Sequence, residues 1–535
     1  MSEIKIEHLW ISLPFFAVLW KGFRFPLPLL DFWWHLKMGE VIFTTGSIPR
    51  TDIFSFTAEG KPFIVQNWLS EIIYYLLYGA GGLELLVFFN ALLLAAALLP
   101  LFALCRESAE SLRLGAFVAT LASLTFFGNI RTQSFAFVLF AGFYWILEGY
   151  RLRKRNFLWV MPLLMLLWVN LHGSFILGLA LITLYLGCET LNLLLKIPGG
   201  GALSGRELRN LLFILLLCLC ATLANPEAHA VYRYIRTVAA DKASQLFVTE
   251  WQAPQVDALD GLVFFYGLFF ICLLTFFYAR RRLALTELVL FLAFTVFAMT
   301  ALRNSIWFPI VAAPILSRHL KSVPFAGLFS SQTGGWTAKI RALFSYGSDA
   351  ARPRHRLNFA LGTLLGLALL LFSPWIGPRL GNTRLLDPNT PVAAMAFIER
   401  NGITGRIFHP QMFGDYLIWR LWPRQKSFID GRVHLFGETF VRDYLELFCD
   451  SAWEEKLQRY QVQYLLLNKS PELGASSKLI AQAKKSQSWR LLYEDSVCVL
   501  FERIESSRVQ AALHSAAGKF QFGFRDQAIA PFTCT

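Results

Sequence analysis

Two acids and a histidine that could do chemistry lie near the start of the chain, among aromatic side chains and turn residues. The stretch DFWWHLKMGEVIFTTGSIPRTDIFSF begins at Asp31 and contains His35 and Asp52. A carboxylate can act as a general base on an acceptor hydroxyl or amine. His35 follows Asp31 by one helical turn and can share that work if the segment is helical. Asp52, in IPRTDIF, fits a second acid of such a site, but an ordinary turn or N-cap residue is the more common role for an acid in this setting.

Cationic and imidazole side chains recur in short polar turns farther along the chain. They are Arg131 in NIRTQSF, His172 in VNLHGSF, Arg233 after NPEAH and Arg303 in ALRNSIWF, with the acid Glu250 in VTEWQ. Arg and His stabilise a phosphate leaving group as its charge develops. Taken singly, Arg131 and Arg303 fit cations that snorkel at helix ends, and His172 fits a capping or packing residue. Taken together with the carboxylates, they predict a pocket for a phosphorylated, lipid-linked substrate.

The composition places these residues in a membrane protein. Of the 535 residues, 55% are hydrophobic and only 16% are charged, whereas soluble domains are about 45–50% apolar. The net charge of +14 is expected from Lys and Arg on cytoplasmic loops, so we predict no nucleic-acid partner. The eight cysteines lack the paired spacing of a zinc site or a disulfide framework. The first apolar segment has no cleavage pattern, which predicts a retained first helix.

Apolar runs near bilayer-spanning length predict about eleven transmembrane helices. They cover residues 8–22, 82–104, 112–128, 134–150, 157–171, 173–196, 209–225, 261–279, 284–302, 303–317 and 357–376. If these spans alternate, the Lys- and Arg-rich loops, including residues 150–155, 280–282 and 318–356, fall on one side. That side is predicted to be the cytoplasm, because short cytoplasmic loops carry an excess of Lys and Arg. The large first loop, residues 22–81, and the turns that carry the cations and Glu250 then face outward.

The C-terminal part of the chain differs from the rest in composition. In residues 385–505 the short β-like runs GRIFHP, QKSFIDG, VQYLLLN and WRLLYEDSVCVLFER alternate with helical patterns. This alternation predicts a small α/β domain, which the topology places outside the membrane. We expect the membrane part to cover residues 1–380 and the polar residues 506–535 to form a loosely ordered tail.

Three residues of the C-terminal domain are candidates for contacting an acceptor or forming a domain interface: Tyr416, Asp430 and Arg432. Asp430 and Arg432 flank a glycine just after an apolar run, where a tight turn can present side chains at the end of a sheet. The same two residues fit a structural ion pair. Tyr416 lies in GDYLIWRLWP, which also fits a surface helix that docks the domain onto the membrane part.

The chain resembles the GT-C superfamily of integral membrane glycosyltransferases, which take a sugar from a polyprenyl-phosphate donor at the extracytoplasmic face. The resemblance covers about residues 1–503 and is closest to an uncharacterised bacterial subgroup with an extracytoplasmic C-terminal domain. It is carried by DFWWH at 31–35, NLHG at 170–173, ALRN at 301–304, GDYLIW at 414–419 and FIDGR at 428–432. The segment GKPFIVQNWLSEIIYYLLYG, residues 60–79, is similar to a helix of this family that lies along the membrane.

The resemblance implies the roles of the candidate residues. Asp31 stands where the family's catalytic acid is expected, but Phe32 follows it in place of the second acid that many members have. We therefore expect a metal-independent, inverting transfer with Asp31 as the base, His35 as its partner and Asp52 as the alternative base. No cofactor is predicted, although a divalent metal is compatible with the family.

The resulting hypothesis is a polytopic α-helical membrane protein of the bacterial inner membrane with glycosyltransferase activity. It would move a sugar, hexosyl or pentosyl, from a polyprenyl-phosphate donor to an extracytoplasmic lipid, glycan or protein. Two alternatives stay open, a transporter or flippase of lipid-linked glycans and a non-catalytic scaffold for envelope assembly. A transporter is less favoured because the sequence shows no obvious inverted repeat and no matching pair of interrupted spans.

Overall fold

The computed structural model contains two compact units. It describes residues 5–126, 128–196, 203–324, 355–448, 450, 452–470 and 476–504. The first unit, called the membrane unit, comprises the described residues of the ranges 1–28, 38–48 and 64–386. The second comprises the described residues of the ranges 29–37, 49–63 and 387–535, and is called the outer unit after the side of the membrane that the sequence predicts for it. Most of the predicted 318–356 loop and all of the predicted tail, residues 506–535, lie outside the described residues.

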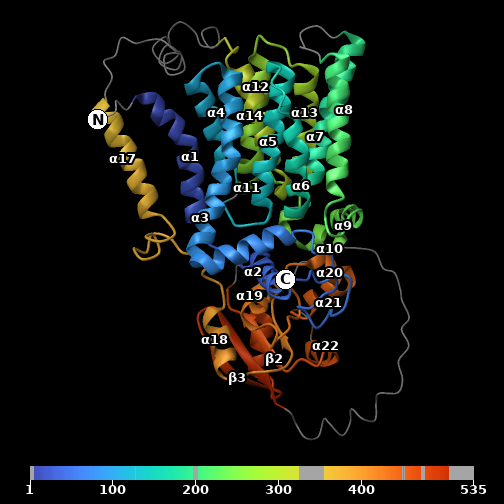
Figure 1. Cartoon of the computed structure of the whole chain (residues 1–535). Coiled ribbons are helices and arrows are strands. Elements are labelled where there is room, and N and C mark those ends of the chain that lie inside the picture. Colours follow the sequence, from blue (N-terminus) through green and yellow to red (C-terminus); the bar gives the residue numbers. More distant parts are fainter. Residues whose placement is uncertain are drawn as a thin grey trace. The chain divides into compact units, whose positions relative to one another are not determined.

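The membrane unit is a bundle of apolar helices (Figure 1). Its main helices are α1 (Ile6–Arg24), α3 (Trp68–Ala109), α4 (Leu112–Leu124), α5 (Gln133–Arg153), α6 (Met161–Leu171), α7 (Phe175–Leu195), α8 (Gly205–Thr222), α12 (Gly267–Tyr278), α13 (Leu285–Thr300), α14 (Trp307–Leu320) and α17 (His355–Leu371). Each predicted span overlaps one of these helices, so the predicted mostly helical fold is confirmed. Among the described residues, α3, α5 and α7 are long and apolar enough to cross a membrane by themselves. The number of crossings therefore stays a prediction.

Shorter helices connect the main ones on the side predicted to face outward. They are α9 (Ala230–Ala239), α10 (Lys242–Phe247), α11 (Leu259–Gly261) and the single turns η2 (Thr249–Trp251) and η4 (Leu302–Asn304). Two more short elements are η1 (Leu158–Val160) and η3 (Leu262–Tyr266). Helix α2 (Phe32–Thr45) follows Asp31 directly, so the helical segment that the shared role of His35 requires is present.

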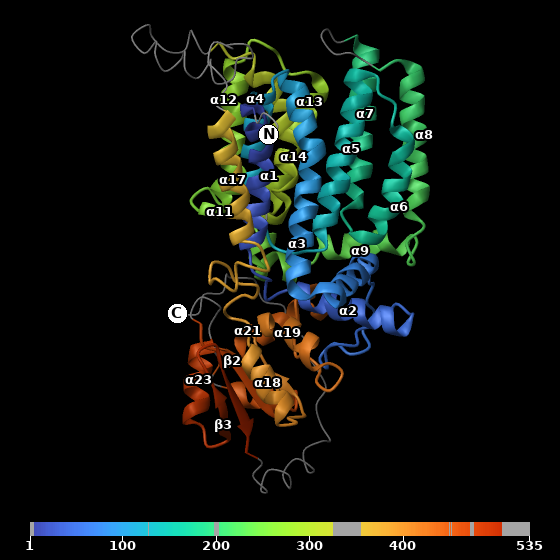
Figure 2. The same ribbon diagram turned by 60° about the vertical axis from the view of Figure 1, so that its left-hand side comes forward.

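Helix α3 consists of two parts that meet at a kink. Gly81 and Gly82 depart from helical geometry, and Gly82 has φ +65° and ψ −157°, a conformation that glycine alone adopts readily. In Figures 1 and 2 the part before the kink runs across the ends of the upright helices, as expected of a helix lying along a membrane. It begins at Trp68 rather than at residue 60. The preceding residues are extended because the Asp52 N–H donates to the Lys61 carbonyl in a short hairpin.

The outer unit contains the predicted α/β domain. Its helices are α18 (Val392–Arg400), α19 (Gln411–Leu421), α20 (Val433–Phe436), α21 (Glu438–Glu446), α22 (Trp453–Arg459) and α23 (Ser476–Lys485), and its strands are β1 (Ile407–Phe408), β2 (Tyr464–Asn468), β3 (Trp489–Glu494) and β4 (Cys498–Arg503). The sheet order is β1-β2-β4-β3, with β1 parallel to β2 and the other pairs antiparallel. The central strands β2 and β4 are almost wholly buried, so the core of the unit lies against them.

The first outer loop supplies part of this unit. The Ser427 N–H donates to the Phe54 carbonyl, and the Phe56 N–H donates back to the Ser427 carbonyl. The Trp422 indole N–H donates to the Ile53 carbonyl over 2.9 Å. Among the described residues, the predicted strand QKSFIDG therefore forms a single bridge with this loop and is not a strand of the sheet. Its backbone hydrogen bonds are used by a segment more than 350 residues earlier in the chain.

Helix α19, which contains GDYLIW, is a core element of the outer unit. Its residues Phe413 to Ile418 are all buried, including the ionisable Asp415. This burial does not fit an exposed surface helix, and the docking of the segment onto the membrane part stays a prediction. An acid at 0% exposure in an apolar helix is costly unless it has partners.

Candidate functional site

Asp31 has a backbone conformation that non-glycine residues adopt rarely. Its φ is +67°, in the left-handed region, where a side chain costs roughly 1–2 kcal/mol. The Asp31 N–H donates to Oδ2 of Asp415 over 2.5 Å, and this bond holds the peptide in place. A strained residue maintained by a buried partner is typical of a functional site.

Gly431 brings a third segment to the same place. Its N–H donates to Oδ1 of Asp415 over 2.9 Å, so the two oxygens of one carboxylate join Asp31 to the FIDGR turn. A Cβ on Gly431 would lie 2.4 Å from Oδ1 of Asp31 and 2.9 Å from Oδ2 of Asp415. Only glycine permits this approach, which sets the Asp31 side chain directly against the turn.

Asp415 lies in an environment that disfavours its charged form. Burial, with the nearby carboxylates of Asp430 and Asp31, raises the pKa of Asp415 well above its ordinary value, and the two backbone N–H donors oppose this rise only in part. The physical reason is that a carboxylate loses its hydration here and meets like charges. Asp415 contacts the peptide of Asp31 and is therefore a positioning residue.

Arg432 is a buried cation of the outer unit. Its Nη2 lies 2.6 Å from Oδ2 of Asp430, and its Nη1 lies 2.7 Å from Oδ1 of Asp52. The guanidinium also lies within 5.5 Å of the ring centroids of Trp34, Phe54 and Phe63, where cation–π attraction adds to the ion pairs. Asp430 and Asp52, together with burial that opposes them, leave the pKa of Arg432 above its ordinary value. Asp430 and Arg432 thus form the structural ion pair that was one of the two interpretations.

Asp52 has both carboxylate oxygens engaged within the outer unit. Besides Arg432, Oδ1 accepts the Phe54 N–H over 3.2 Å, and Oδ2 accepts the Ser55 N–H over 3.1 Å and the Ser55 hydroxyl over 2.5 Å. The Asp52 carboxylate thus accepts hydrogen bonds from the turn that follows it, in addition to its buried ion pair with Arg432. The contacts favour the turn interpretation of Asp52 over the base interpretation.

Aromatic side chains surround the start of α2. The Trp33 ring packs edge-on against Tyr416 at a centroid distance of 5.0 Å, and the His35 ring lies 3.7 Å from the Trp34 ring. His35 and Tyr416 are both buried. Tyr416, which follows Asp415 in the sequence, therefore packs within the outer unit. His35 lies one turn after Asp31 on α2.

In the membrane unit, two predicted cations share one acid. Arg131 Nη1 lies 2.5 Å from Oε2 of Glu250, and Arg303 Nη1 lies 3.3 Å from Oε1. The Arg303 guanidinium also lies 4.6 Å from the Trp251 ring centroid. Burial raises the pKa of Glu250, but the attraction of Arg131 and Arg303 outweighs it, so the pKa of Glu250 lies below its ordinary value. Three turns that are far apart in sequence thus meet in one charged cluster.

The other two residues predicted to bind phosphate in the membrane unit are His172 and Arg233. The Nδ1 of His172 contacts the Ser174 hydroxyl over 2.8 Å and accepts the Ser174 N–H over 3.1 Å, at the start of α7. This is the capping arrangement that was one interpretation of His172. Arg233 is exposed on the amphipathic helix α9, one turn before the exposed Arg236.

Several ionisable residues with strong contacts were not among the predicted ones. Asp415 is the central one; its signal was an acid within the otherwise apolar run FGDYLIW. Glu148 and Glu189 lie inside predicted spans, where an ionisable residue is a functional hypothesis by default, and both contact Arg151 in the membrane unit. Within the described part of the chain, no group of three or more His, Cys, Asp or Glu side chains is placed to hold a metal ion.

His409 is a further buried residue of the outer unit. It is 0% exposed, its Nε2 accepts the Phe428 N–H over 2.9 Å, and its Nδ1 lies 3.0 Å from the Pro410 carbonyl oxygen. An acceptor at Nε2 and a donor at Nδ1 fit the neutral ring. Burial lowers the pKa of His409 to about 4.

Comparisons with known proteins identify the fold. No family model and no curated protein matches the sequence. The oligosaccharyltransferase AglB from Archaeoglobus fulgidus, solved with an inhibitory peptide and a dolichol-phosphate, matches over 94% of this chain and 74% of its own at 10% identity and a TM-score of 0.55. The oligosaccharyltransferase of that organism tethered to an acceptor peptide matches over 93% and 74% at 14% identity and a TM-score of 0.54. At these identities the likeness establishes a shared fold.

ArnT from Cupriavidus metallidurans, bound to undecaprenyl phosphate, also matches. It covers 93% of this chain and 98% of its own at 14% identity, with a TM-score of 0.43. That score is too low to argue from.

Removal of the Arg432 charge tests the buried ion pairs. We expect Arg432→Met to destabilise the outer unit by about 3–5 kcal/mol, because Asp52 and Asp430 stay buried without their cation. Arg442→Met is the control, since the Arg442–Glu438 pair is about one-third exposed and such pairs contribute about 0–1 kcal/mol. Hydrogen exchange of the β2 and β4 amides in the full-length protein measures the loss of stability in both variants. A similar loss in the two variants would contradict a special role for Arg432.

The lowered pKa of His409 predicts a pH dependence. The unfolded chain binds a proton near pH 6.5, and the folded outer unit resists it until about pH 4, so stability is lost as the pH falls through this window. The loss is about 3 kcal/mol, at roughly 1.4 kcal/mol per pKa unit. Asp415 changes the stability in the opposite direction, because its raised pKa favours the folded state at low pH. This contribution is the same in wild type and in a His409 variant, so it cancels when the two are compared.

The comparison is between wild type and His409→Gln, whose amide retains one donor and one acceptor. Hydrogen exchange of the outer unit at pH 7, 6, 5 and 4 gives the stability difference between them. We expect wild type to lose stability relative to the variant on acidification. A difference that is constant with pH would show that His409 titrates normally in the folded unit.

Proposed function

We propose that this chain, which has the GT-C fold, is a membrane glycosyltransferase. It would move a sugar from a polyprenyl-phosphate donor to an extracytoplasmic lipid, glycan or protein acceptor. The observation that carries the proposal is the position of Asp31, strained in the left-handed region and held by Asp415 against Gly431. The fold likeness supports it, since the AglB structure contains a dolichol-phosphate, which has the chemistry of the proposed carrier.

In the proposed reaction, Asp31 is the general base. The acceptor O–H or N–H loses its proton to the Asp31 carboxylate while its oxygen or nitrogen bonds to the anomeric carbon of the sugar. The bond from that carbon to the phosphate oxygen breaks on the opposite face, and its electron pair leaves with the polyprenyl phosphate. Attack from the opposite face inverts the configuration. Asp415 supports this role because it fixes the Asp31 peptide from a helix of the core.

The leaving phosphate needs cations, and the membrane unit offers an arginine pair. Arg131 and Arg303 both contact the carboxylate of Glu250. We propose that the donor phosphate competes with Glu250 for these guanidiniums, which bind phosphate well because of their planar set of N–H donors. His172 and Arg233 remain secondary candidates for the same substrate.

The remaining features of the hypothesis carry over as proposals. The protein would act in the bacterial inner membrane, with the outer unit extracytoplasmic, as the positive loops indicate. Transfer would proceed without a metal or another cofactor, with Asp31, supported by His35, as the base.

Replacement of Asp31 tests the enzymatic proposal. We expect Asp31→Asn to reduce transfer of radiolabelled sugar, from a panel of polyprenyl-phosphate donors to an envelope lipid extract, by about 10²–10⁴-fold, the usual contribution of a general base. Donor binding should persist. Asp443→Asn, an exposed acid of α21, is the matched control and should transfer normally. Equal transfer by the two variants would exclude Asp31 as the base, and no transfer by wild type with any donor would favour the transporter or scaffold.

Glu250 provides a separate test of the phosphate site. We expect Arg303→Gln to raise the KM for the donor about tenfold, the loss of one charge-assisted hydrogen bond. Glu250→Gln should lower that KM, because it removes the competing charge while leaving both arginines in place. The exposed Arg206→Gln variant controls for the loss of a positive charge. If Glu250→Gln raised the KM as Arg303→Gln does, the three residues would form a structural cluster and not a phosphate site.

A further inference from the structure

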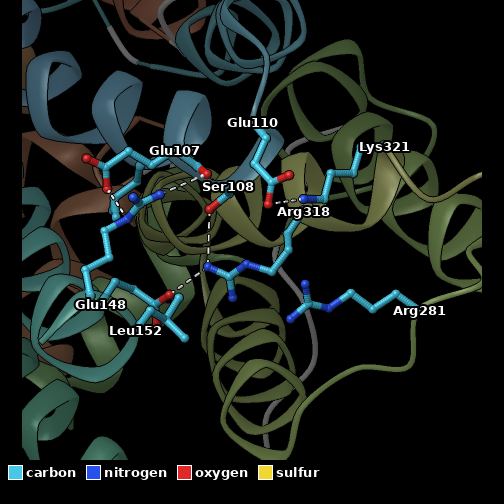
Figure 3. A pocket seen from close by; sticks show the side chains of 10 residues that line it. Glu107, Ser108, Glu110, Glu148, Leu152, Arg281, Arg318 and Lys321 are labelled. Carbon is cyan, nitrogen blue, oxygen red and sulfur yellow. Dashed lines mark hydrogen bonds and ion pairs between the residues drawn. The ribbon is translucent and has the colours of Figure 1, made fainter. Parts of the chain in front are cut away.

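A cavity of about 250 Å³ lies among helix ends of the membrane unit. Its charged lining comes from the end of α3 (Glu107, Glu110), from α5 (Glu148, Arg153), from the end of α14 (Arg318, Lys321) and from Arg281 between α12 and α13 (Figure 3). These helix ends adjoin the Lys- and Arg-rich loops, the side that the sequence predicts to be cytoplasmic. None of the residues of the proposed reaction lines this cavity.

Most charges of the lining are already paired. Arg153 Nε lies 2.9 Å from Oε2 of Glu107, and Lys321 Nζ lies 2.6 Å from Oε1 of Glu110. Arg281 is the one lining cation that has no ion pair within the described part of the chain. In Figure 3 its guanidinium extends toward Arg318 across the cavity. The lining has four cations and three acids, so one positive charge is in excess.

The floor of the cavity is fixed by a buried network. Arg318 is 5% exposed, and its guanidinium contacts Glu287, Glu148 at 2.9 Å and the Ser108 hydroxyl at 3.2 Å. Glu148 is bound in addition by Arg151 and by the Tyr185 hydroxyl. With these acids satisfied, the network has no spare carboxylate to neutralise a further cation at the rim.

The main chain of Arg281 is held in place as well. The Nδ1 of His319, a residue at 0% exposure, lies 3.2 Å from the Arg281 carbonyl oxygen, and its Nε2 lies 3.0 Å from Oε2 of Glu287. The loop is thus anchored to the buried network, and the exposed Arg281 side chain is presented at the rim. The hydrogen bond and charge of Lys321 lower the pKa of Glu110. Burial opposes them, and the charges of Arg281 and Arg153 add smaller contributions in the lowering direction, which agrees with a positive potential here.

We propose that this cavity binds a phosphate group, supplied by an anionic lipid headgroup or by a small soluble phosphate compound. Guanidinium and ammonium groups converging on a small polar space match the oxygens of a phosphate. The volume is below the roughly 300–1,000 Å³ of pockets for drug-sized ligands, which suits a headgroup or a small anion. Basic pockets between helices on the cytoplasmic side recognise lipid headgroups by the same chemistry.

The test uses the full-length protein and two neighbouring arginines. Arg281→Gln removes the cation at the rim, and Arg282→Gln removes the same charge from an exposed residue that does not line the cavity. One arm titrates detergent-purified protein with inorganic phosphate, with chloride at equal ionic strength as the reference, and follows thermal stabilisation. The other arm measures retention of phosphatidylglycerol against phosphatidylcholine by native mass spectrometry.

We expect Arg281→Gln to weaken binding of at least one phosphate probe about tenfold, and Arg282→Gln to change it less than about twofold. An effect with phosphatidylglycerol alone assigns the site to a lipid headgroup, and an effect with inorganic phosphate assigns it to a soluble compound. The proposal is overturned if wild type binds neither probe, or if both variants weaken binding equally, because general surface charge then explains it.

Discussion

The carboxylate of Asp415 joins two segments of the outer unit that are almost 400 residues apart in sequence. One oxygen accepts the N–H of Asp31 and the other accepts the N–H of Gly431. This bridge helps to keep Asp31 at φ +67°, a conformation that is unfavourable for an L residue. The position of the proposed base is therefore a tertiary property. It depends on the buried helix α19 and on a glycine that lets the backbone approach two carboxylates.

The same region is unusual in its balance of charges. One guanidinium, that of Arg432, serves Asp52 and Asp430 directly, while Asp415 lies near further acids and has a raised pKa. A buried acid without its own cation is costly, and the backbone N–H donors offset only part of that cost. Such an arrangement is hard to explain by stability alone, because a leucine in place of Asp415 would fit an apolar helix better. The arrangement is explained if its role is to hold Asp31 in place.

The sequence predicted the helical elements well and the site only in outline. Bilayer-length apolar runs constrain the chain strongly, so a helix overlaps each of the predicted spans. The motifs DFWWH, GDYLIW and FIDGR supply segments that meet in the outer unit. Asp415 was missed because one acid in an apolar helix has no local partner that a sequence pattern reveals. The QKSFIDG strand was wrong for a related reason, since its pairing partner, Phe54 to Phe56, lies in the first outer loop. Both cases involve contacts between distant segments, which periodicity does not encode.

The buried charges of the membrane unit are arranged differently from those of the outer unit. Glu148, Glu287 and Arg318 form a closed set in which the cation contacts both acids, as the cost of an isolated ion at membrane depth requires. These paired residues link α5, α13 and α14, and little of their charge is left to bind an anion. The groups able to attract an anion are then those at the ends of the bundle, where the solvent lowers the cost of an excess cation. Arg131 and Arg303 share a single acid at one such position, Glu250, and Arg281 borders the cavity at another. The buried pairs therefore link the helices to one another, whereas the cations of the turns lie where an anion can approach them.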